Sequence, residues 1–503
     1  MFVKKEEAVK LLDLLLNCSH AIAIKAHEYL GTHNRIRGYF KYPIANNIFP
    51  KDNPEYDKYR EEIPYLIYGI TKYELMDFPD NRIHYGAIFD GYNDDRIKIE
   101  DIIEFKELLD YIFNTPGMIK VFAEEEKSDN IKYRIKDMIY SSVVRYLYKV
   151  NASSDVPDDI DDHLKPYNCE ALLRYIDEKL KIDICIPICL ATFEEDNIKL
   201  FEHGEIVRIP EEIQKSRQKA CSYEANNEDW VAACATHMIV LHNYQFENKA
   251  YFSINEATRN SHAYPIQTID EIMAIIRVVT GYSIGYEQIL TLPLGWVDTC
   301  YEDLQPIYGA KAYAVNSKET EKFWMQLPVS FIDSEQIKQI RNLYIELCSV
   351  EKNKKTGKLF FALKRLNRCM LRDEKDDRAI DATIGLEALL SGGTQGEITY
   401  TISNRIPVVF TSEDNTKYKP ENVREIMRKI YNYRSRVVHG DELRNNDKII
   451  EINDTKMEVE DLAVDFLRCT FLYILKNPKY LDAKKFDECI DGIIAKYKKN
   501  ECK

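Results

Sequence analysis

The sequence predicts a multidomain protein that is mainly helical, with a mixed α/β middle domain and a C-terminal helical bundle. Its 503 residues are enough for about two to four domains. Hydrophobic residues make up 45% of the chain, which is enough for sizeable cores, while 18 Gly and 17 Pro are too few for a collagen-like or disordered chain. Apolar residues recur at helical spacing towards both ends of the chain and alternate in parts of its middle.

The composition also predicts a cytoplasmic protein that needs no metal or cofactor and binds no membrane. No stretch of about 18 residues is apolar and uncharged throughout, so no membrane span is expected. Glu6, Glu7 and Asp13 interrupt the apolar run near the N-terminus, which favours an amphipathic helix over a signal peptide. The 12 cysteines show no repeated CxxC spacing, which indicates free thiols in a reducing compartment and not a zinc site.

The first predicted domain, residues 1–155, is helical. Apolar residues at helical spacing predict helices over residues 6–29, 99–113 and 130–150. Residues 39–92 form an aromatic, Pro-containing segment with many tyrosines and few regular periods. The polar, acidic segment 151–162 (NASSDVPDDIDD) is the expected boundary of this domain.

The second predicted domain, residues 163–333, combines strands and helices and is expected to sense or regulate. Alternating residues predict strands at 182–193, 286–294 and 310–315, and a hairpin formed by 198–201 and 205–209. Helical periods predict helices at 228–244 and 269–280. On the first of these helices Cys234 and His237 would share a face. A role in packing is favoured over metal binding for these two residues. Neither GxGxxG nor GxxxxGK[ST] occurs, so no chemistry is assigned to this domain.

The third predicted domain, residues 335–503, is a bundle of six or seven helices. Asp333 and Ser334 are expected to cap the first helix. The expected helices cover residues 335–348, 358–371, 379–390, 397–409, 421–438, 458–475 and 483–498.

Residues 420–440 (PENVREIMRKIYNYRSRVVHG) are the most informative segment of this bundle. Pro420 suits the first turn of a helix, and Gly440 suits the position just after its end. Arg434 and His439 are five residues apart, so on an ideal helix they diverge by about 140° and lie about 7.5 Å apart along the axis. A guanidinium can bind a phosphodiester through paired hydrogen bonds, and RNA carries its own nucleophile, the 2′-hydroxyl. A base or acid together with a cation is therefore enough to cut RNA without a metal.

Residues 431–440 (YNYRSRVVHG) closely resemble the RxxxxH motif of HEPN domains, which are helical modules of prokaryotic defence and toxin systems. Upstream, residues 384–390 (IGLEALL) and 398–410 (ITYTISNRIPVVF) resemble, in order and spacing, the Apea-like branch of that superfamily. The resemblance covers about residues 335–503, the last third of the chain, and does not extend to the first 330 residues.

The resemblance implies a metal-independent endoribonuclease of the anti-phage defence or toxin type, as in abortive infection, which acts as a homodimer through its C-terminal domain. The facing Arg–His pairs would form one cleft in which the 2′-hydroxyl attacks the phosphate. Carried over to this sequence, Arg434 and His439 are the expected catalytic pair, and Glu387 is a supporting catalytic residue. Three further residues are expected to contact the RNA substrate: Arg405, Ser435 and Arg436.

The distribution of charge agrees with an RNA-binding C-terminal domain. The whole chain has a net charge of −14, which on its own argues against nucleic acid. Residues 335–503 carry a net +4 and residues 1–334 a net −18. The acidity therefore belongs to the part that is expected to sense a phage component or a nucleotide, and the candidate nuclease is mildly basic.

Two alternatives remain open at this stage. Arg434 and His439 also fit structural roles, as an arginine on the helix surface and a histidine that caps the C-terminus of the helix. Glu387 also fits a structural ion pair with an arginine such as Arg405. The bundle would then be a non-catalytic RNA-binding, dimerisation or interaction module that regulates a partner.

Overall fold

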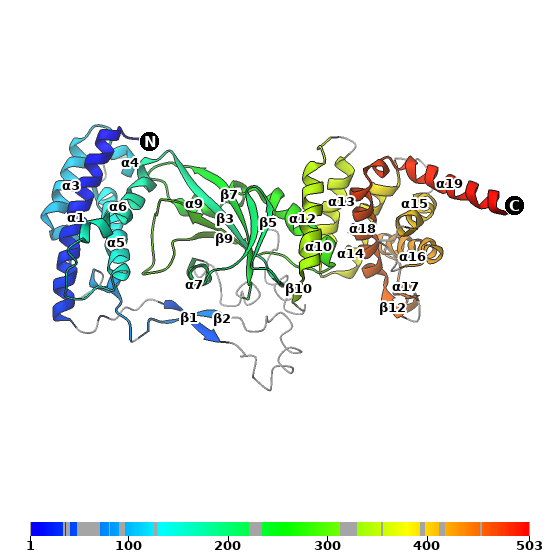
Figure 1. Cartoon of the computed structure of the whole chain (residues 1–503), viewed down its shortest axis with the longest axis horizontal. Coiled ribbons are helices and arrows are strands. Elements are labelled where there is room, and N and C mark those ends of the chain that lie inside the picture. The colour runs from blue at the N-terminus through cyan, green and yellow to red at the C-terminus, as the bar shows by residue number, and fades with distance from the viewer. Residues whose placement is uncertain are drawn as a thin grey trace.

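The structure, a computed structural model, describes residues 2–501 apart from 34–35, 37–40, 48–70, 80, 90–95, 125–127, 221–233, 312–328, 354–355, 393–397, 412–417 and 453–454. Figure 1 shows an elongated molecule with helices at the N-terminal end, a sheet in the middle and further helices at the C-terminal end. The described chain is therefore mostly helical with a mixed sheet region. None of the helices in the described ranges is both long enough and apolar enough to cross a membrane.

The N-terminal helices share one hydrophobic core. The main helices are α1 (Lys5–Thr32), α3 (Ile103–Asn114), α5 (Ser128–Lys149) and α6 (Ile160–Ile176), with the short helix α4 (Ile119–Phe122) between α3 and α5. On α1, Leu11, Leu15, Cys18 and Ile22 are buried at helical spacing. The three helices predicted in this region are confirmed. The core continues through α6 to Ile176, beyond the boundary expected at residues 151–162.

The tyrosine-rich segment contains a two-stranded sheet, where no regular structure is expected from the sequence. Strands β1 (Lys41–Asn47) and β2 (Thr71–Asp77) pair antiparallel and contact α7 (Glu211–Ala220). The segment between them, residues 48–70, lies outside the described residues.

The central sheet has six antiparallel strands in the order β5-β6-β7-β3-β8-β9. Their bounds are β3 (Lys179–Pro187), β5 (Asn197–Phe201), β6 (Gly204–Arg208), β7 (His237–Glu247), β8 (Gln288–Pro293) and β9 (Tyr308–Lys311). A small parallel pair joins β4 (Ala191–Phe193) to β10 (Ser330–Ile332). The same part of the chain contains α10 (Ile266–Thr280) and the short helix α9 (Ile254–Arg259), of which α9 contacts β9. The predicted hairpin and the predicted helix 269–280 are confirmed. Most of the strand predicted at 310–315 lies outside the described residues.

The prediction of a helix at residues 228–244 is wrong from His237 onwards. These residues form β7, which lies between β3 and β6 in the sheet. Residues 237–241 are all buried, because a central strand covered on both faces is a nearly continuous apolar run and lacks the alternation that marks a half-exposed strand. Residues 228–233 lie outside the described part of the chain. Cys234 and His237 therefore do not share a helix face, and the described residues contain no cluster of three potential metal ligands.

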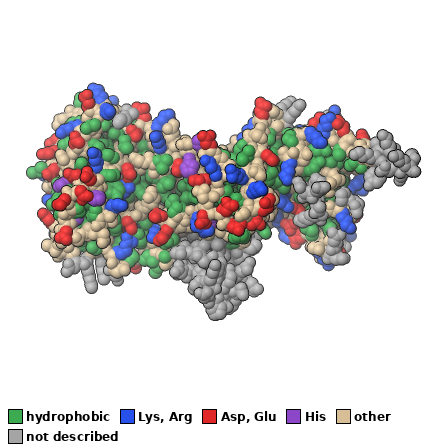
Figure 2. Space-filling model, in the orientation of Figure 1, with side chains coloured by type: hydrophobic (Ala, Val, Ile, Leu, Met, Phe, Trp, Pro, Cys, Tyr) green, Lys and Arg blue, Asp and Glu red, His purple; other side chains and the backbone are tan. Residues whose placement is uncertain are grey.

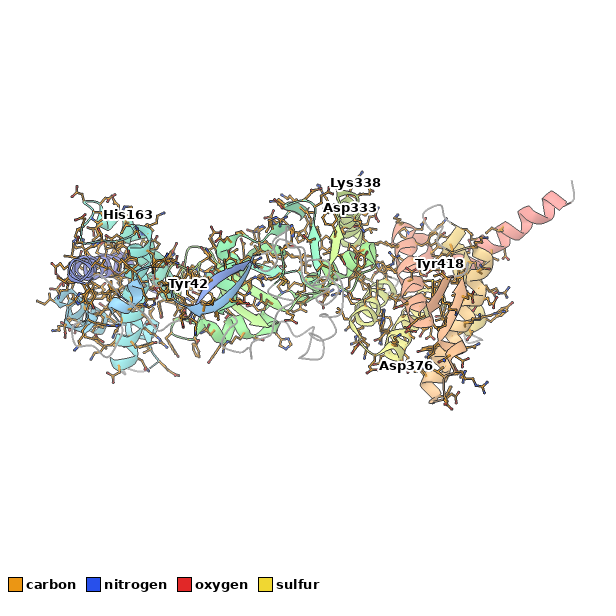
Figure 3. All side chains as sticks on the ribbon, turned by 90° about the horizontal axis from the view of Figure 1, so that it is seen from below. Tyr42, His163, Asp333, Lys338, Asp376 and Tyr418 are labelled. Carbon is orange, nitrogen blue, oxygen red and sulfur yellow. The ribbon has the colours of Figure 1, made fainter. Side chains whose placement is uncertain are left out.

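The C-terminal helices follow the predicted order. Asp333 caps α12 through its side chain, which accepts a hydrogen bond of 2.8 Å from the Gln336 amide, and Figure 3 shows it beside Lys338 of the same helix. Pro407 lies where α15 gives way to the 3-10 turn η4, because proline cannot donate the next helical hydrogen bond. The bounds are α12 (Ser334–Ser349), α13 (Gly357–Leu371), α14 (Lys375–Leu390), α15 (Ile398–Arg405), η4 (Ile406–Thr411), α16 (Pro420–His439), α17 (Asn445–Lys448), α18 (Val459–Lys476) and α19 (Lys484–Glu501). The hairpin formed by β11 (Ile449–Ile452) and β12 (Thr455–Glu458) lies in a region that is expected from the sequence to be mostly loop.

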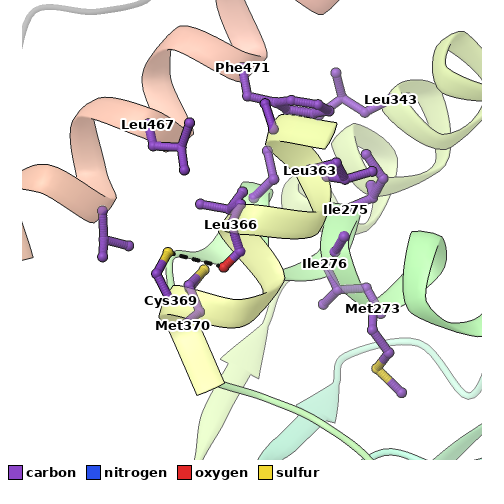
Figure 4. Packing of buried hydrophobic residues seen from close by; sticks show 14 of the residues in the cluster. Met273, Ile275, Ile276, Leu343, Leu363, Leu366, Cys369, Met370, Leu467 and Phe471 are labelled. Atoms are coloured by element: carbon purple, nitrogen blue, oxygen red, sulfur yellow. Dashed lines mark hydrogen bonds between the residues drawn. The ribbon is translucent and has the colours of Figure 1, made fainter. Parts of the chain in front are cut away.

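The sheet and the C-terminal helices are joined by a continuous hydrophobic core. Figure 4 shows Ile275 and Ile276 of α10 beside Leu363 and Leu366 of α13, with Phe471 of α18 near the same helix. One cluster of buried residues runs without interruption from the sheet to Phe486. The junction between these two parts is therefore a packed interface and not a free linker.

Candidate functional site

The candidate site is built on α16, whose ends follow the predicted signals. Pro420 occupies the first turn, and Gly440 ends the helix with φ of +74°, a left-handed conformation that glycine adopts without strain. Val423, Met427 and Ile430 form the buried face. Since the helix continues to His439, the side chains of Arg434 and His439 point about 140° apart within one chain.

Arg434 lies between the buried and the exposed face of this helix, with 30% of its side chain exposed. Its Nη2 is 3.9 Å from Oε1 of Glu387 on α14, which is an ion-pair distance and too long for a hydrogen bond. Its Nε is buried and has no hydrogen-bond partner among the described residues. The guanidinium is thus held near a carboxylate without a hydrogen bond to it, and the exposed part of the side chain can donate to a further acceptor.

Glu387 is fixed from the other side by Tyr431, a residue that the sequence analysis did not single out. The Tyr431 hydroxyl donates a hydrogen bond to Oε1 of Glu387. Burial, and then this bond to a carboxylate, raise the pKa of Tyr431 well above its usual range, so the phenol remains a donor. Tyr431 and Arg434 are three residues apart on α16, a spacing that places two side chains on neighbouring positions of a helix. That spacing was the available signal for including Tyr431.

Arg405, which is expected to contact the substrate, is engaged within the chain. Only 4% of the residue is exposed. Its guanidinium donates to both carboxylate oxygens of Asp487 on α19, at 2.8 and 2.6 Å, and to the carbonyl oxygens of Leu390 and Ser391 at the end of α14. These contacts tie α15 to α14 and α19 and leave little of the guanidinium for RNA. The alternative ion pair between Glu387 and Arg405 is replaced by the one between Glu387 and Arg434.

Arg436 is also engaged within the chain. Its guanidinium contacts the Asp447 carboxylate and the Glu442 carbonyl oxygen, and so holds the loop that follows α16. Ser435 is half-buried. The exposed charge of Arg436 is therefore partly balanced, and its first role is to order the loop after Gly440.

His439 is exposed in the last turn of α16, and its imidazole makes no hydrogen bond with the described residues. On a helix of 3.6 residues per turn it shares a face with Arg424, Arg428 and Ser435. The exposed Glu425 lies on the same side, and its carboxylate pairs with Lys429 at 3.6 Å. Arg424 and Arg428 are exposed, and the Arg424 guanidinium lies 6.0 Å from the ring of the exposed Tyr400 on α15. The His439 face therefore combines cations with an aromatic ring, the side chains that bind phosphates and bases of RNA.

This basic face is local. On the side of the molecule shown in Figure 2, acidic and basic side chains of the described residues are interspersed over all three parts. The grouping of Arg424, Arg428 and His439 on one face of α16 is therefore a more specific indication of RNA binding than the net charge of the C-terminal region.

Comparison with known proteins gives no further guidance. No family model matches the chain, and no similar protein was found among curated proteins or solved structures.

Proposed function

We propose that the C-terminal helices form a metal-independent endoribonuclease of the HEPN type. The observation that carries the proposal is the state of Arg434, whose guanidinium lies beside Glu387 without a hydrogen bond to it while 30% of the side chain is exposed. The RxxxxH spacing, the exposed His439 and the basic face beside it support the same function.

The reaction needs only groups that this chain and the RNA supply. The 2′-oxygen forms a bond to the adjacent phosphorus, and the bond from phosphorus to the 5′-oxygen breaks. His439 takes the proton of the 2′-hydroxyl or returns one to the departing 5′-oxygen. Arg434 stabilises the charge that develops on the phosphoryl oxygens. The products are a 2′,3′-cyclic phosphate and a 5′-hydroxyl.

The proposed active form is a homodimer. Within one chain Arg434 and His439 diverge by about 140°, so one helix cannot direct both side chains at the same phosphate. A second copy of α16 facing the first would place the histidine of one chain near the arginine of the other. The exposed Val438, at 52% relative exposure beside His439, gives this end of the helix an apolar contact.

The test is RNA cleavage in the presence of a chelator. Purified protein, Arg434→Ala and His439→Ala are incubated with labelled RNA and EDTA, with Lys429→Ala on the same helix as the control. Wild type and control are expected to leave cyclic phosphate ends, and each site variant to lose at least about a hundredfold in rate. Loss of cleavage on chelation, or full activity of His439→Ala, would contradict the mechanism.

A second candidate follows from the same divergence of Arg434 and His439. If no second chain completes the cleft, the bundle binds RNA or a partner without cutting it. RNA binding by wild type, without cleavage at any protein concentration, would favour this function. In both cases residues 1–333 are proposed to sense the trigger, a phage component or a nucleotide, of a defence or abortive-infection response.

A further inference from the structure

A groove of about 940 Å³ lies between α10 and α13, where the sheet meets the C-terminal helices. Figure 1 shows these helices on the side of the bundle that faces the sheet, whereas α16 lies beyond α14 and α18. The groove is therefore separate from the candidate nuclease site. Its size and its position between two parts of the chain are typical of small-molecule sites.

One wall of the groove carries two exposed cations on α13. Lys364 and Arg368 are four residues apart, so they lie on the same face of the helix one turn apart. Neither forms an ion pair with a described residue. The charge of Lys364 acts on the Asp270 carboxyl, but no ion pair with a described residue occupies either cation, so both are a ready contact for a phosphate group.

The floor of the groove contains a buried arginine with only neutral hydrogen-bond partners. Arg277 is 2% exposed and donates to the carbonyl oxygen of Ile284 at 2.7 Å and to Oδ1 of Asn367 at 2.6 Å. Burial lowers its pKa to about 10, so the guanidinium remains charged at neutral pH. No described carboxylate lies within ion-pair distance of it, and its positive charge adds to that of the wall.

The acidic side chains of the groove are mostly occupied. Glu271 accepts hydrogen bonds from Gln267 at 2.8 Å and from Lys352 at 3.0 Å. Asp270 accepts a hydrogen bond of 3.0 Å from the hydroxyl of Tyr286, and burial raises the pKa of its carboxyl. The groove therefore favours an anion, and Asp270 remains as one acceptor for an amino or hydroxyl group.

An aromatic ring accompanies the cations. Phe361 is three residues before Lys364 and is 41% exposed, although a phenylalanine on a helix surface gains nothing from contact with water. Phe360 also lines the groove. Phe361, Lys364 and Arg368, at positions i, i+3 and i+7, form one stripe along α13.

We propose that this groove binds a nucleotide, with its phosphates on Lys364 and Arg368 and its base on Phe361. A phosphate alone would need only the cations, and a purely apolar ligand would need only the ring. Asp270 lies where it could accept a hydrogen bond from the base or the ribose. A regulatory role for this nucleotide rests on the proposed nuclease function, because α13 packs on α14, the helix that carries Glu387.

The experiment measures binding directly. The full-length protein is titrated with ATP, GTP, CTP, UTP, their monophosphates and inorganic phosphate by isothermal calorimetry. Variants are Lys364→Ala combined with Arg368→Ala, and Phe361→Ala alone. The matched control combines Lys338→Ala and Arg341→Ala, an exposed lysine and arginine on the neighbouring helix α12 outside the groove.

At least one nucleotide is expected to bind the wild-type protein more tightly than inorganic phosphate does. The double variant is expected to bind that nucleotide about tenfold or more weakly, and the control variant is expected to bind it as the wild type does. Phe361→Ala is expected to weaken the binding of the nucleotide and to leave the binding of inorganic phosphate unchanged. The proposal would be overturned if no nucleotide bound, or if the double variant bound nucleotides as tightly as the wild-type protein does. Binding of single-stranded RNA in the groove without binding of any free nucleotide would also overturn it. RNA cleavage is measured with and without the bound nucleotide, so that a protein that binds it but cuts no RNA refutes the nuclease and not the groove.

Discussion

The hydroxyl of Tyr431 donates a hydrogen bond to Oε1 of Glu387, the same oxygen that lies 3.9 Å from Nη2 of Arg434. Two residues of α16 therefore hold one carboxylate of α14 between them. Tyr431 is 5% exposed, so its part of this contact is shielded from water. Its phenol fixes the position of Glu387, and the carboxylate in turn restrains the guanidinium without forming a hydrogen bond with it.

Tyr431→Phe is expected to slow RNA cleavage about three- to tenfold with only a small loss of stability. Removing the hydroxyl frees Glu387 to move, and one buried hydrogen bond contributes about 1 kcal/mol to folding. Single-turnover cleavage rates and thermal unfolding midpoints measure the two effects. Tyr433→Phe is the matched control, because Tyr433 donates in the same way to Asp376, away from Glu387. Equal slowing by both variants would contradict the positioning role of Tyr431.

Arg405→Ala is expected to lower the free energy of unfolding by about 3 kcal/mol, because it leaves Asp487 and two carbonyl oxygens without their partner. Urea denaturation measures this change. Lys485→Ala, which removes an exposed contact with Glu488, is the control and is expected to change stability by less than about 0.5 kcal/mol. A stable Arg405→Ala protein that no longer binds RNA would restore the substrate contact expected from the sequence.

The sequence predicted α16 well and the groove between α10 and α13 not at all. The proline and glycine at the ends of α16 and its apolar stripe are local signals, so helix, caps and buried face follow from about twenty neighbouring residues. Arg277 and Asn367 are 90 residues apart, and no local pattern brings them together. The helix expected at β7 is wrong for a related reason, since the pairing of β7 with β3 and β6 depends on segments elsewhere in the chain. Local periods therefore predict α16 itself, and tertiary packing decides which partners Arg405 and Arg434 have.

Gly385→Ala is expected to destabilise the protein by about 1–3 kcal/mol, although alanine favours helices more than glycine does. A Cβ at this position of α14 would lie 2.7 and 2.8 Å from the two methyl carbons of Leu467 on α18. Gly492→Ala on α19 is the matched control, because no atom lies within 4 Å of its added Cβ, and it is expected to stabilise by about 0.5–1 kcal/mol. Thermal unfolding of the two variants gives the comparison, and equal effects would rule out the close packing of α14 on α18.

His237 is expected to make the protein less stable as the pH falls. Burial lowers its pKa from 6.5 to about 4, so the unfolded chain binds a proton in this range before the folded chain does. Stability is therefore lost between pH 6.5 and 4, by up to about 3 kcal/mol from this residue. His237→Gln, which does not titrate, is expected to flatten that part of the stability profile in urea denaturation at several pH values. An unchanged slope would show that the imidazole is already protonated in the folded protein.

His242, on the same strand, is expected to act in the opposite direction. Burial would lower its pKa, but its contacts with Asp183 at 3.0 Å and Glu205 at 3.2 Å outweigh burial and raise it. A raised pKa in the folded state means that stability is present at acidic pH and is lost as the pH rises through that pKa. His242→Gln should therefore cost most stability near pH 5 and least near pH 8, the reverse of His237→Gln. Imidazole titration by NMR checks the two directions in one experiment, and a pKa of His242 below that of a free histidine would contradict the ion pairs.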